Sequence, residues 1–228
     1  MEASTARSRG IWARRGLASR NRIDRTVHAM LLRQLYLAHF EQRQFKAALE
    51  VAEQAAELDV LPDVVQQDLA RALVALGDVD RAVSHLRLAA RVGPASRRAF
   101  HWWTLGSILY VAGRLEDAAG ALERAARWGT RDKPLYQGHL ALAQRALGLP
   151  TADLAELYER LEAVPAGRGY GRFVLGLLAE QRAERELARR HLEAFVVRST
   201  EGRAALAIAL EGEVELARVA LARLAQPT

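Results

Sequence analysis

The chain has 228 residues, of which 50% are hydrophobic and 26% are charged, and it contains no cysteine. A disulfide framework, a thiolate metal site and a cysteine nucleophile are therefore excluded. The sequence has no apolar run of the roughly 18 residues that a membrane-spanning helix needs, and no apolar segment of a secretory signal at its start. We therefore expect an ordered protein in the cytoplasm, with peripheral membrane attachment and organellar import as alternatives.

The first 25 residues are the most basic part of the chain. They hold seven arginines against Glu2 and Asp24, a net charge of +5, whereas the whole chain carries +6. We interpret residues 1–25 as a basic N-terminal tail or extension. It either stays solvated or binds an anionic membrane, RNA or an acidic protein. The residues for such binding are Arg7, Arg9, Arg14, Arg15, Arg20, Arg22 and Arg25.

The remaining sequence repeats with a period of 34 to 36 residues. Two independent series share this period: Leu35, Leu69, Leu105, Leu140 and Leu175, and Ala48, Ala82, Ala118, Asp153 and Ala188. Short segments with turn-forming residues lie between the two markers of each unit, for example VAGRLEDA at 111–118. Each unit is therefore predicted to be one antiparallel helical hairpin.

The third unit begins with two adjacent tryptophans. Trp102, Leu105, Gly106 and Leu109 fall at i, i+3, i+4 and i+7, the spacing of one buried stripe on a helix. Neighbouring residues of a helix point about 100° apart, so Trp103 cannot face the same core as Trp102. A second apolar face indicates a second neighbour or a binding surface.

These residues resemble the tetratricopeptide repeat, whose pattern begins Trp-x-x-Leu-Gly and continues with a small residue in the second helix. Trp102, Leu105, Gly106, Ala118 and Ala125 match the pattern, whereas the fourth unit departs from it most, with Asp153 and Arg160 at small packing positions. The resemblance implies an all-α fold, a right-handed α-solenoid of stacked antiparallel hairpins. It divides residues 26–228 into repeats at about 29–62, 63–98, 99–133, 134–168 and 169–200, and a capping hairpin at 201–226.

In this family the first helix of each hairpin lines a concave groove that binds peptides or helices. By resemblance, Trp102 packs between hairpins and Trp103 faces the groove, which favours a protein partner presenting a peptide or an amphipathic helix. The alternative is that the chain's own tail fills the groove. Arg33 and Arg71 are not accompanied by the asparagines with which some members of this family bind a C-terminal carboxylate. The implied groove residues are Arg33, Leu37, Gln67, Arg71, Trp103, Ser107, Gly138, Leu142, Phe173 and Leu177.

Motifs for catalysis are poor. The six histidines have no HExxH spacing, and Glu156, Glu159 and Glu162 fit a solvated helix face better than an acid/base pair. The glycines of AGRGYGR at 166–172 follow no predicted strand, so an inter-repeat loop is favoured over a phosphate site. We expect a non-enzymatic adaptor or assembly subunit without metal, cofactor or small-molecule substrate. The alternative is a factor that holds an anionic membrane surface or nucleic acid through its tail.

Overall fold

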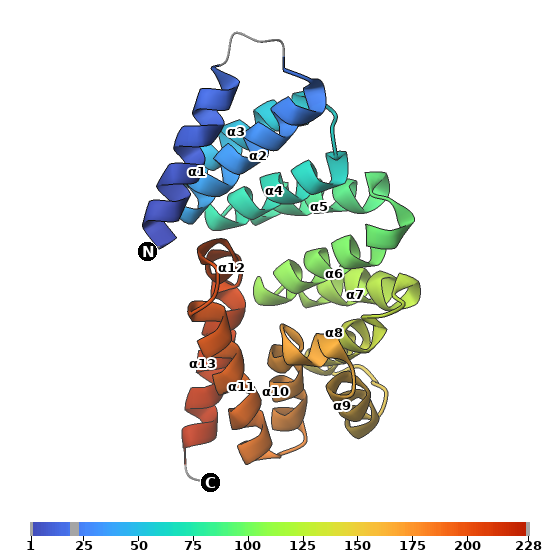
Figure 1. Ribbon diagram of the computed structural model, residues 1–228. Helices are drawn as coiled ribbons and strands as arrows, with labels where there is room; N and C mark the ends of the chain where they lie inside the picture. Colours follow the sequence, from blue (N-terminus) through green and yellow to red (C-terminus); the bar gives the residue numbers. More distant parts are fainter. Residues whose placement is uncertain (1, 19–22, 227–228) are drawn as a thin grey trace. The chain divides into compact units, whose positions relative to one another are not determined.

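The computed structural model describes residues 2–18 and 23–226, and these residues form helices and turns without any strand. The predicted all-α fold is thus confirmed. The chain divides into two compact units, Met1–Pro94 and Ala95–Thr228, called unit 1 and unit 2 below (Figure 1). None of the described helices is both long enough and apolar enough to cross a membrane.

Unit 1 contains two of the predicted hairpins and one further helix. The hairpins pair α2 with α3 and α4 with α5, and α1 packs along α2 (Figure 1). The segment expected to be a basic tail is thus largely helical. The helices of unit 1 are α1 (Glu2–Leu17), α2 (Arg25–Glu41), α3 (Phe45–Glu57), α4 (Pro62–Ala75) and α5 (Val79–Val92).

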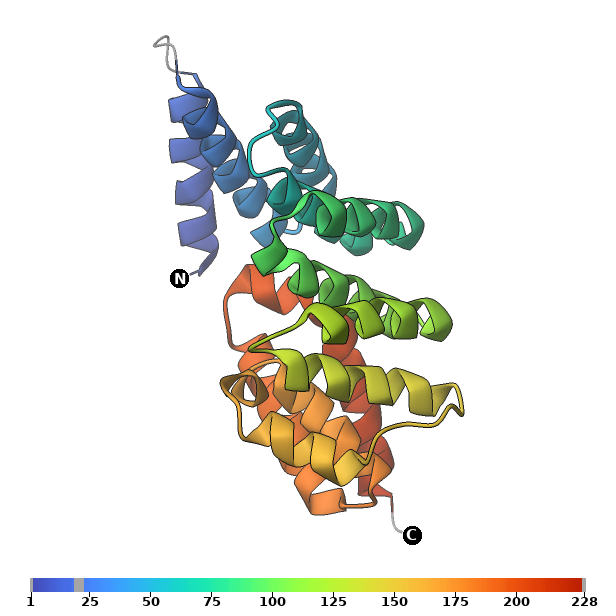
Figure 2. The same cartoon turned by 90° about the vertical axis from the view of Figure 1, so that its right-hand side faces the viewer.

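Unit 2 contains the next three hairpins and two C-terminal helices. The hairpins lie side by side in chain order (Figure 2). The last helix, α13, packs along α11 and also contacts α6 and α10. The elements of unit 2 are α6 (Ala95–Val111), α7 (Leu115–Trp128), α8 (Lys133–Ala146), α9 (Leu154–Glu162), the short 3-10 helix η1 (Pro165–Arg168), α10 (Gly171–Gln181), α11 (Arg185–Thr200), α12 (Ala204–Ala209) and α13 (Glu211–Ala225).

The turn inside each hairpin contains a residue in the left-handed conformation, which reverses the chain after the first helix. Glycine holds this position in the three central hairpins, at Gly77, Gly113 and Gly148. In the first and last hairpins it is held by Arg43 (φ 58°) and Ala183 (φ 60°). A side chain makes this conformation unfavourable, so these two turns are strained relative to the glycine turns.

The start of α9 corrects one expectation from the repeat pattern. Asp153 was expected at a small packing position of the fourth unit, but it is the N-cap of α9. Its carboxylate accepts hydrogen bonds from the backbone N–H groups of Ala155 (2.7 Å) and Glu156 (3.1 Å). An aspartate satisfies the free N–H groups at a helix start well, so the helix begins after this residue.

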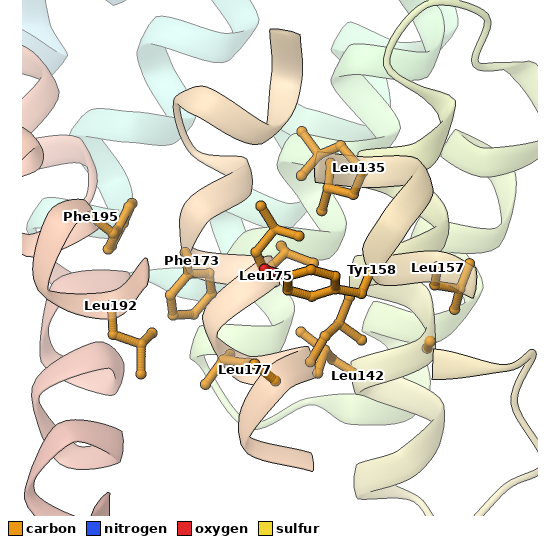
Figure 3. Close-up of a cluster of buried hydrophobic side chains, with 14 of the residues drawn as sticks. Leu135, Leu142, Leu157, Tyr158, Phe173, Leu175, Leu177, Leu192 and Phe195 are labelled. Atoms are coloured by element: carbon orange, nitrogen blue, oxygen red, sulfur yellow. The ribbon is translucent and has the colours of Figure 1, made fainter. Parts of the chain in front are cut away.

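The two helices of a hairpin approach each other closely at the repeated small residues. The repeated alanines, such as Ala118 and Ala188, are fully buried. A Cβ atom at Gly106 would lie 2.5 Å from Cγ of Leu122, and one at Gly176 would lie 2.6 Å from Cγ of Leu192. The core of unit 2 forms around these contacts, with Leu192 and Phe195 of α11 next to Phe173 of α10 (Figure 3).

Two glycine substitutions in unit 2 test this close approach. Gly106→Ala should lower the free energy of unfolding by about 1–3 kcal/mol, because the new methyl group overlaps Leu122. Gly120→Ala in α7 is the matched control, because a Cβ there has no atom within 4 Å. It should stabilise by about 0.5–1 kcal/mol through helix propensity. Urea unfolding of both variants measures the difference, and a stabilised Gly106→Ala would contradict the packing.

Candidate functional site

The first helices of the three hairpins in unit 2 bring a group of rings together, which we call the inner cluster: Trp103, Tyr136, His139, Tyr170 and Phe173. Trp103 of α6 packs edge-on against Tyr170, with ring centroids 4.7 Å apart, and lies 6.0 Å from Tyr136 of α8. His139 of α8 lies 6.0 Å from Tyr170 and 6.3 Å from Phe173. Edge-to-face ring pairs at such distances contribute beyond the burial of their area.

One edge of the inner cluster carries a polar group, which we call the Glu213 triad: Ser107 of α6, Tyr170 before α10, and Glu213 of α13. Ser107 Oγ donates a hydrogen bond to Glu213 Oε1 at 2.8 Å, and the Tyr170 hydroxyl donates to the same oxygen at 3.2 Å. The two hydroxyl oxygens lie 2.6 Å apart. Glu213 is 6% exposed, so its carboxyl group depends on these partners for hydrogen bonding.

Burial determines the protonation of these groups. It raises the pKa of Glu213, although the hydrogen bond from Ser107 opposes this shift. Burial, together with the nearby charge of Glu213, also raises the pKa of Tyr170 well above its usual value. Burial lowers the pKa of His139 to about 3. At neutral pH His139 and Tyr170 are therefore uncharged.

The inner cluster also holds polar atoms without hydrogen-bond partners among the described residues. They are Nε1 of Trp103 and both ring nitrogens of His139, which is fully buried. Each buried polar group without a partner costs roughly 1–3 kcal/mol. The cluster is thus not optimised for stability alone.

Helix α13 contributes Glu213 to the triad and is held at both of its ends. At its start, a Cβ atom on Gly212 would lie 2.4 Å from Cγ1 of Val111, so the backbone of α13 passes directly against the end of α6. At its end, Arg223 forms a salt bridge of 3.0 Å with Glu180, and Arg185 donates hydrogen bonds to two terminal carbonyl groups. Between these ends α13 packs along α11 and buries Val214, Ala217 and Ala220, while its leucines at 216, 221 and 224 are partly buried against the core of unit 2.

The groove residues expected in unit 2 lie on these same first helices, but most of them are buried. Ser107 is 4% exposed, Leu142 4%, Phe173 0% and Leu177 7%, and Gly138 is buried as well. Trp103 is partly buried in the inner cluster. Trp102 is also partly buried, and the guanidinium of Arg124 lies 4.8 Å from the centre of its ring. We call the side of unit 2 on which the first helices α6, α8 and α10 converge its inner face. In this conformation the inner face is therefore covered.

Sequence reasoning did not identify Tyr170, His139 or Glu213 as residues of this surface. One signal was present: Glu213 lies beside Val214 on the stripe of α13 that continues with Ala217 and Ala220. An acidic residue on an otherwise apolar stripe predicts a buried polar partner.

The groove residues expected in unit 1 are more accessible. Arg33, Leu37 and Arg71 are partly exposed, whereas Gln67 is buried. Arg33 Nε donates to Oδ2 of Asp68 at 3.0 Å, and Arg71 Nη1 lies 3.8 Å from Oδ1 of the same carboxylate. The pair of arginines thus shares one buried internal acid.

The arginines of the N-terminal segment differ in their surroundings. Arg9 forms a salt bridge of 2.7 Å with Glu41, while Arg7, Arg14 and Arg15 are exposed on α1 and Arg25 is exposed at the start of α2. Arg20 and Arg22 lie outside the described residues. Helix α1 packs on α2 through buried Ala6 and Ala13 and through Gly10, whose added Cβ would lie 3.3 Å from that of Ala38. Within the described residues, no group of three acidic or histidine side chains is arranged to hold a metal ion.

Because His139 is buried and neutral, the pH dependence of stability tests the packing of the inner cluster. Its pKa is about 3 in the folded chain and near 6.5 in the unfolded chain, so the unfolded state binds more protons between these values. The stability that comes from a neutral His139 is therefore fully present above pH 6.5. As the pH falls towards 3, the free energy of unfolding decreases by at most about 1.4 kcal/mol per pH unit. His139→Leu should remove this loss, because leucine does not titrate.

Urea unfolding between pH 7.5 and 4.5 measures the effect. The stability of His139→Leu relative to wild type should increase steadily as the pH falls. Tyr110→Phe is the control, since Tyr110 contacts the same histidine at a ring distance of 5.0 Å but does not titrate in this range. Parallel pH profiles for wild type and His139→Leu would show that His139 is not held neutral.

Comparison with known proteins identifies the fold. No family model matches the sequence, and a search of curated proteins finds no significant match. Among solved structures, PilF of Pseudomonas aeruginosa is 18% identical with a TM-score of 0.57, over 88% of this chain and 90% of PilF. MamA is 18% identical with a TM-score of 0.50, over 81% of this chain and 97% of MamA.

A third similar structure is the C-terminal part of a TPR repeat-containing protein from Cytophaga hutchinsonii. It is 13% identical with a TM-score of 0.56, over 98% of this chain and 91% of that structure. These identities are low, so the likeness concerns the arrangement of the helices. The resemblance found in the sequence is thereby confirmed: the chain is an all-α solenoid of helical hairpins with the tetratricopeptide-repeat fold.

Proposed function

We propose that the chain is a non-enzymatic protein-interaction adaptor or assembly subunit. It binds a peptide or an amphipathic helix of a protein partner on the first helices of its hairpins. The observation that carries this proposal is that α13, which packs chiefly along the second helix α11, also contacts the first helices α6 and α10 and is bound there by Ser107 and Tyr170. A surface that binds one amphipathic helix has the shape and the chemistry to bind another.

The proposed contact residues have the character of an interface. In unit 2 they are Trp103, Ser107, Leu142, Phe173 and Leu177, an apolar and aromatic set of the kind that dominates binding energies. In unit 1 they are Arg33, Leu37, Gln67 and Arg71, where the apolar and charged side chains are partly exposed. Arg33, Leu37 and Arg71 are thus accessible to a partner, whereas Gln67 is buried.

Two matched substitutions in unit 1 test the proposal. Leu37→Asp places a charge on a first helix, and Val92→Asp places the same charge on an exposed position of the second helix α5. The full-length chain serves as bait in its native extract, and isotope-labelled mass spectrometry compares capture by each variant. Leu37→Asp should reduce capture of the specific partner by about thirtyfold, the effect of losing one central contact, while Val92→Asp should capture it normally.

Thermal unfolding of both variants provides the control for folding. Equal loss of the partner by two folded variants, or a loss confined to Val92→Asp, would place recognition away from the first helices. A chain that captures no protein specifically would contradict the adaptor function itself.

A second candidate function concerns α1. This helix exposes Trp12 (68%) and Ile11 (48%) beside the exposed arginines Arg7, Arg14 and Arg15, and the Arg15 guanidinium lies 5.3 Å from the centre of the Trp12 ring. Exposed aromatic and aliphatic side chains among arginines are typical of helices that lie on anionic membranes. We propose such a surface as the partner of α1.

Vesicle sedimentation tests this contact. The full chain should bind vesicles with phosphatidylserine more strongly than neutral ones, and binding should weaken with salt. Trp12→Ala and Arg14→Gln should each weaken it severalfold, whereas Arg9→Gln serves as control because Arg9 is paired with Glu41. If RNA binds instead, and Trp12→Ala leaves that binding intact, the partner of α1 is a nucleic acid.

A further inference from the structure

The contacts of α13 describe what the inner face of unit 2 recognises. The third residue of this helix, Glu213, places its carboxyl oxygen within reach of two hydroxyl donors, Ser107 Oγ and the Tyr170 hydroxyl. Both hydroxyl hydrogens can point at a carboxyl oxygen. The two hydroxyl oxygens can also accept hydrogen bonds, but a permanently charged ammonium or guanidinium group buried beside two neutral hydroxyls would have an uncompensated desolvation cost, whereas a carboxyl group can reduce this cost by binding a proton. The site therefore selects an acidic group at the start of a helix.

The remaining contacts of α13 define a pattern of small residues. Gly212 allows the backbone to pass Val111 at the end of α6. Val214, Ala217 and Ala220 are 5%, 0% and 0% exposed and follow the helical spacing of three. The bound helix thus reads Gly-Glu-Val-x-x-Ala-x-x-Ala in the N- to C-terminal direction.

The attachment of α13 relies on few fully buried apolar side chains. These are Val214, Ala217 and Ala220, which bury less apolar area than the leucines and phenylalanines of the hairpin helices. Leu216, Leu221 and Leu224 also pack against the core of unit 2, but they are only partly buried. Helix α12, which leads into α13, has no buried residue. The docked state also leaves Trp103 Nε1 and the His139 nitrogens without partners in the described part of the chain. A helix with larger side chains and the same acidic group would therefore compete well for this face.

We infer that α13 is an internal stand-in for the partner, and that the inner face of unit 2 is a receptor for a partner helix with a carboxylate in its first turn and small residues along the following stripe. This inference rests on the proposed adaptor function and specifies the ligand of that surface. Binding of the partner displaces α13, so access to the receptor face depends on the strength of the internal contact.

Substitutions that loosen α13 in the full-length chain test the inference. Ala217→Arg introduces a large charge on the buried side of α13, whereas Val219→Arg introduces the same residue at a position that is 44% exposed. The probe is a fluorescent synthetic peptide of residues 204–226. It should bind the Ala217→Arg chain at least about tenfold more tightly than the wild-type or Val219→Arg chains, in which the tethered helix competes at high effective concentration.

The chemistry of the ligand is tested with the same peptide. A Glu213→Ala peptide should bind the Ala217→Arg chain about tenfold more weakly, and a Glu213→Lys peptide should not bind measurably, because neither side chain accepts hydrogen bonds from Ser107 and Tyr170. Equal binding of the three peptides would overturn the assignment of a carboxylate. Equal affinity of the unsubstituted peptide for all three chains would show that α13 is a fixed part of the fold.

Folding and competing occupants are controlled separately. Circular dichroism establishes that the Ala217→Arg chain remains helical. Gly212→Leu, whose Cβ would overlap Val111, is a second way to loosen α13. If the peptide binds neither of these folded chains, the inference is overturned. If light scattering shows that the loosened chains form dimers that the peptide dissociates, the occupant is α13 of a second copy and the partner helix is overturned. The test uses purified components, so it can fail while the Leu37→Asp experiment still supports the adaptor.

Discussion

The fold depends on one steric requirement, seen most clearly in the α6–α7 and α10–α11 hairpins: the two helices must come close enough for backbone and side chain to touch. Small residues at a fixed period meet this requirement, with Ala118 facing the first helix and Gly106 facing Leu122. A hairpin of this size cannot bury its apolar stripe alone, so the stripe is covered by the next hairpin. The spacing of the small residues therefore sets both the hairpin and its stacking.

The inner face of unit 2 follows from the same stacking. Because the first helices of the three hairpins are neighbours, their side chains converge on one side, where Trp103, His139 and Tyr170 meet. This convergence collects large rings and a few polar atoms in a single place. Helix α13 contributes a carboxyl group at this point. The result is a well-packed surface in which some polar ring atoms have no hydrogen-bond partner among the described residues. Such a compromise is typical of surfaces selected for binding as well as for folding.

The sequence was sufficient to predict the helical hairpins, because these depend on local periodicity. It gave coverage of the groove only as an alternative, by the chain's own tail. It did not identify α13 as the helix that covers Ser107, since the contact between Ser107 and Glu213 joins residues 106 positions apart. It also missed the helical state of the N-terminal segment, whose packing depends on Ala6 and Ala13 rather than on large apolar residues. Asp153 was misassigned because a helix cap overrides the register of the repeat.

The two strained turns have a consequence for the order in which the chain opens. Arg43 and Ala183 occupy left-handed positions in the first and last hairpins, while glycine relieves the same turn in the three hairpins between them. Terminal units of repeat proteins open most readily. Here α1 packs on the first hairpin and α13 on the last, and the strain in the two turns lowers the free energy needed to open each of these hairpins. Because α13 packs along α11 of the last hairpin, opening of that hairpin also uncovers the inner face of unit 2.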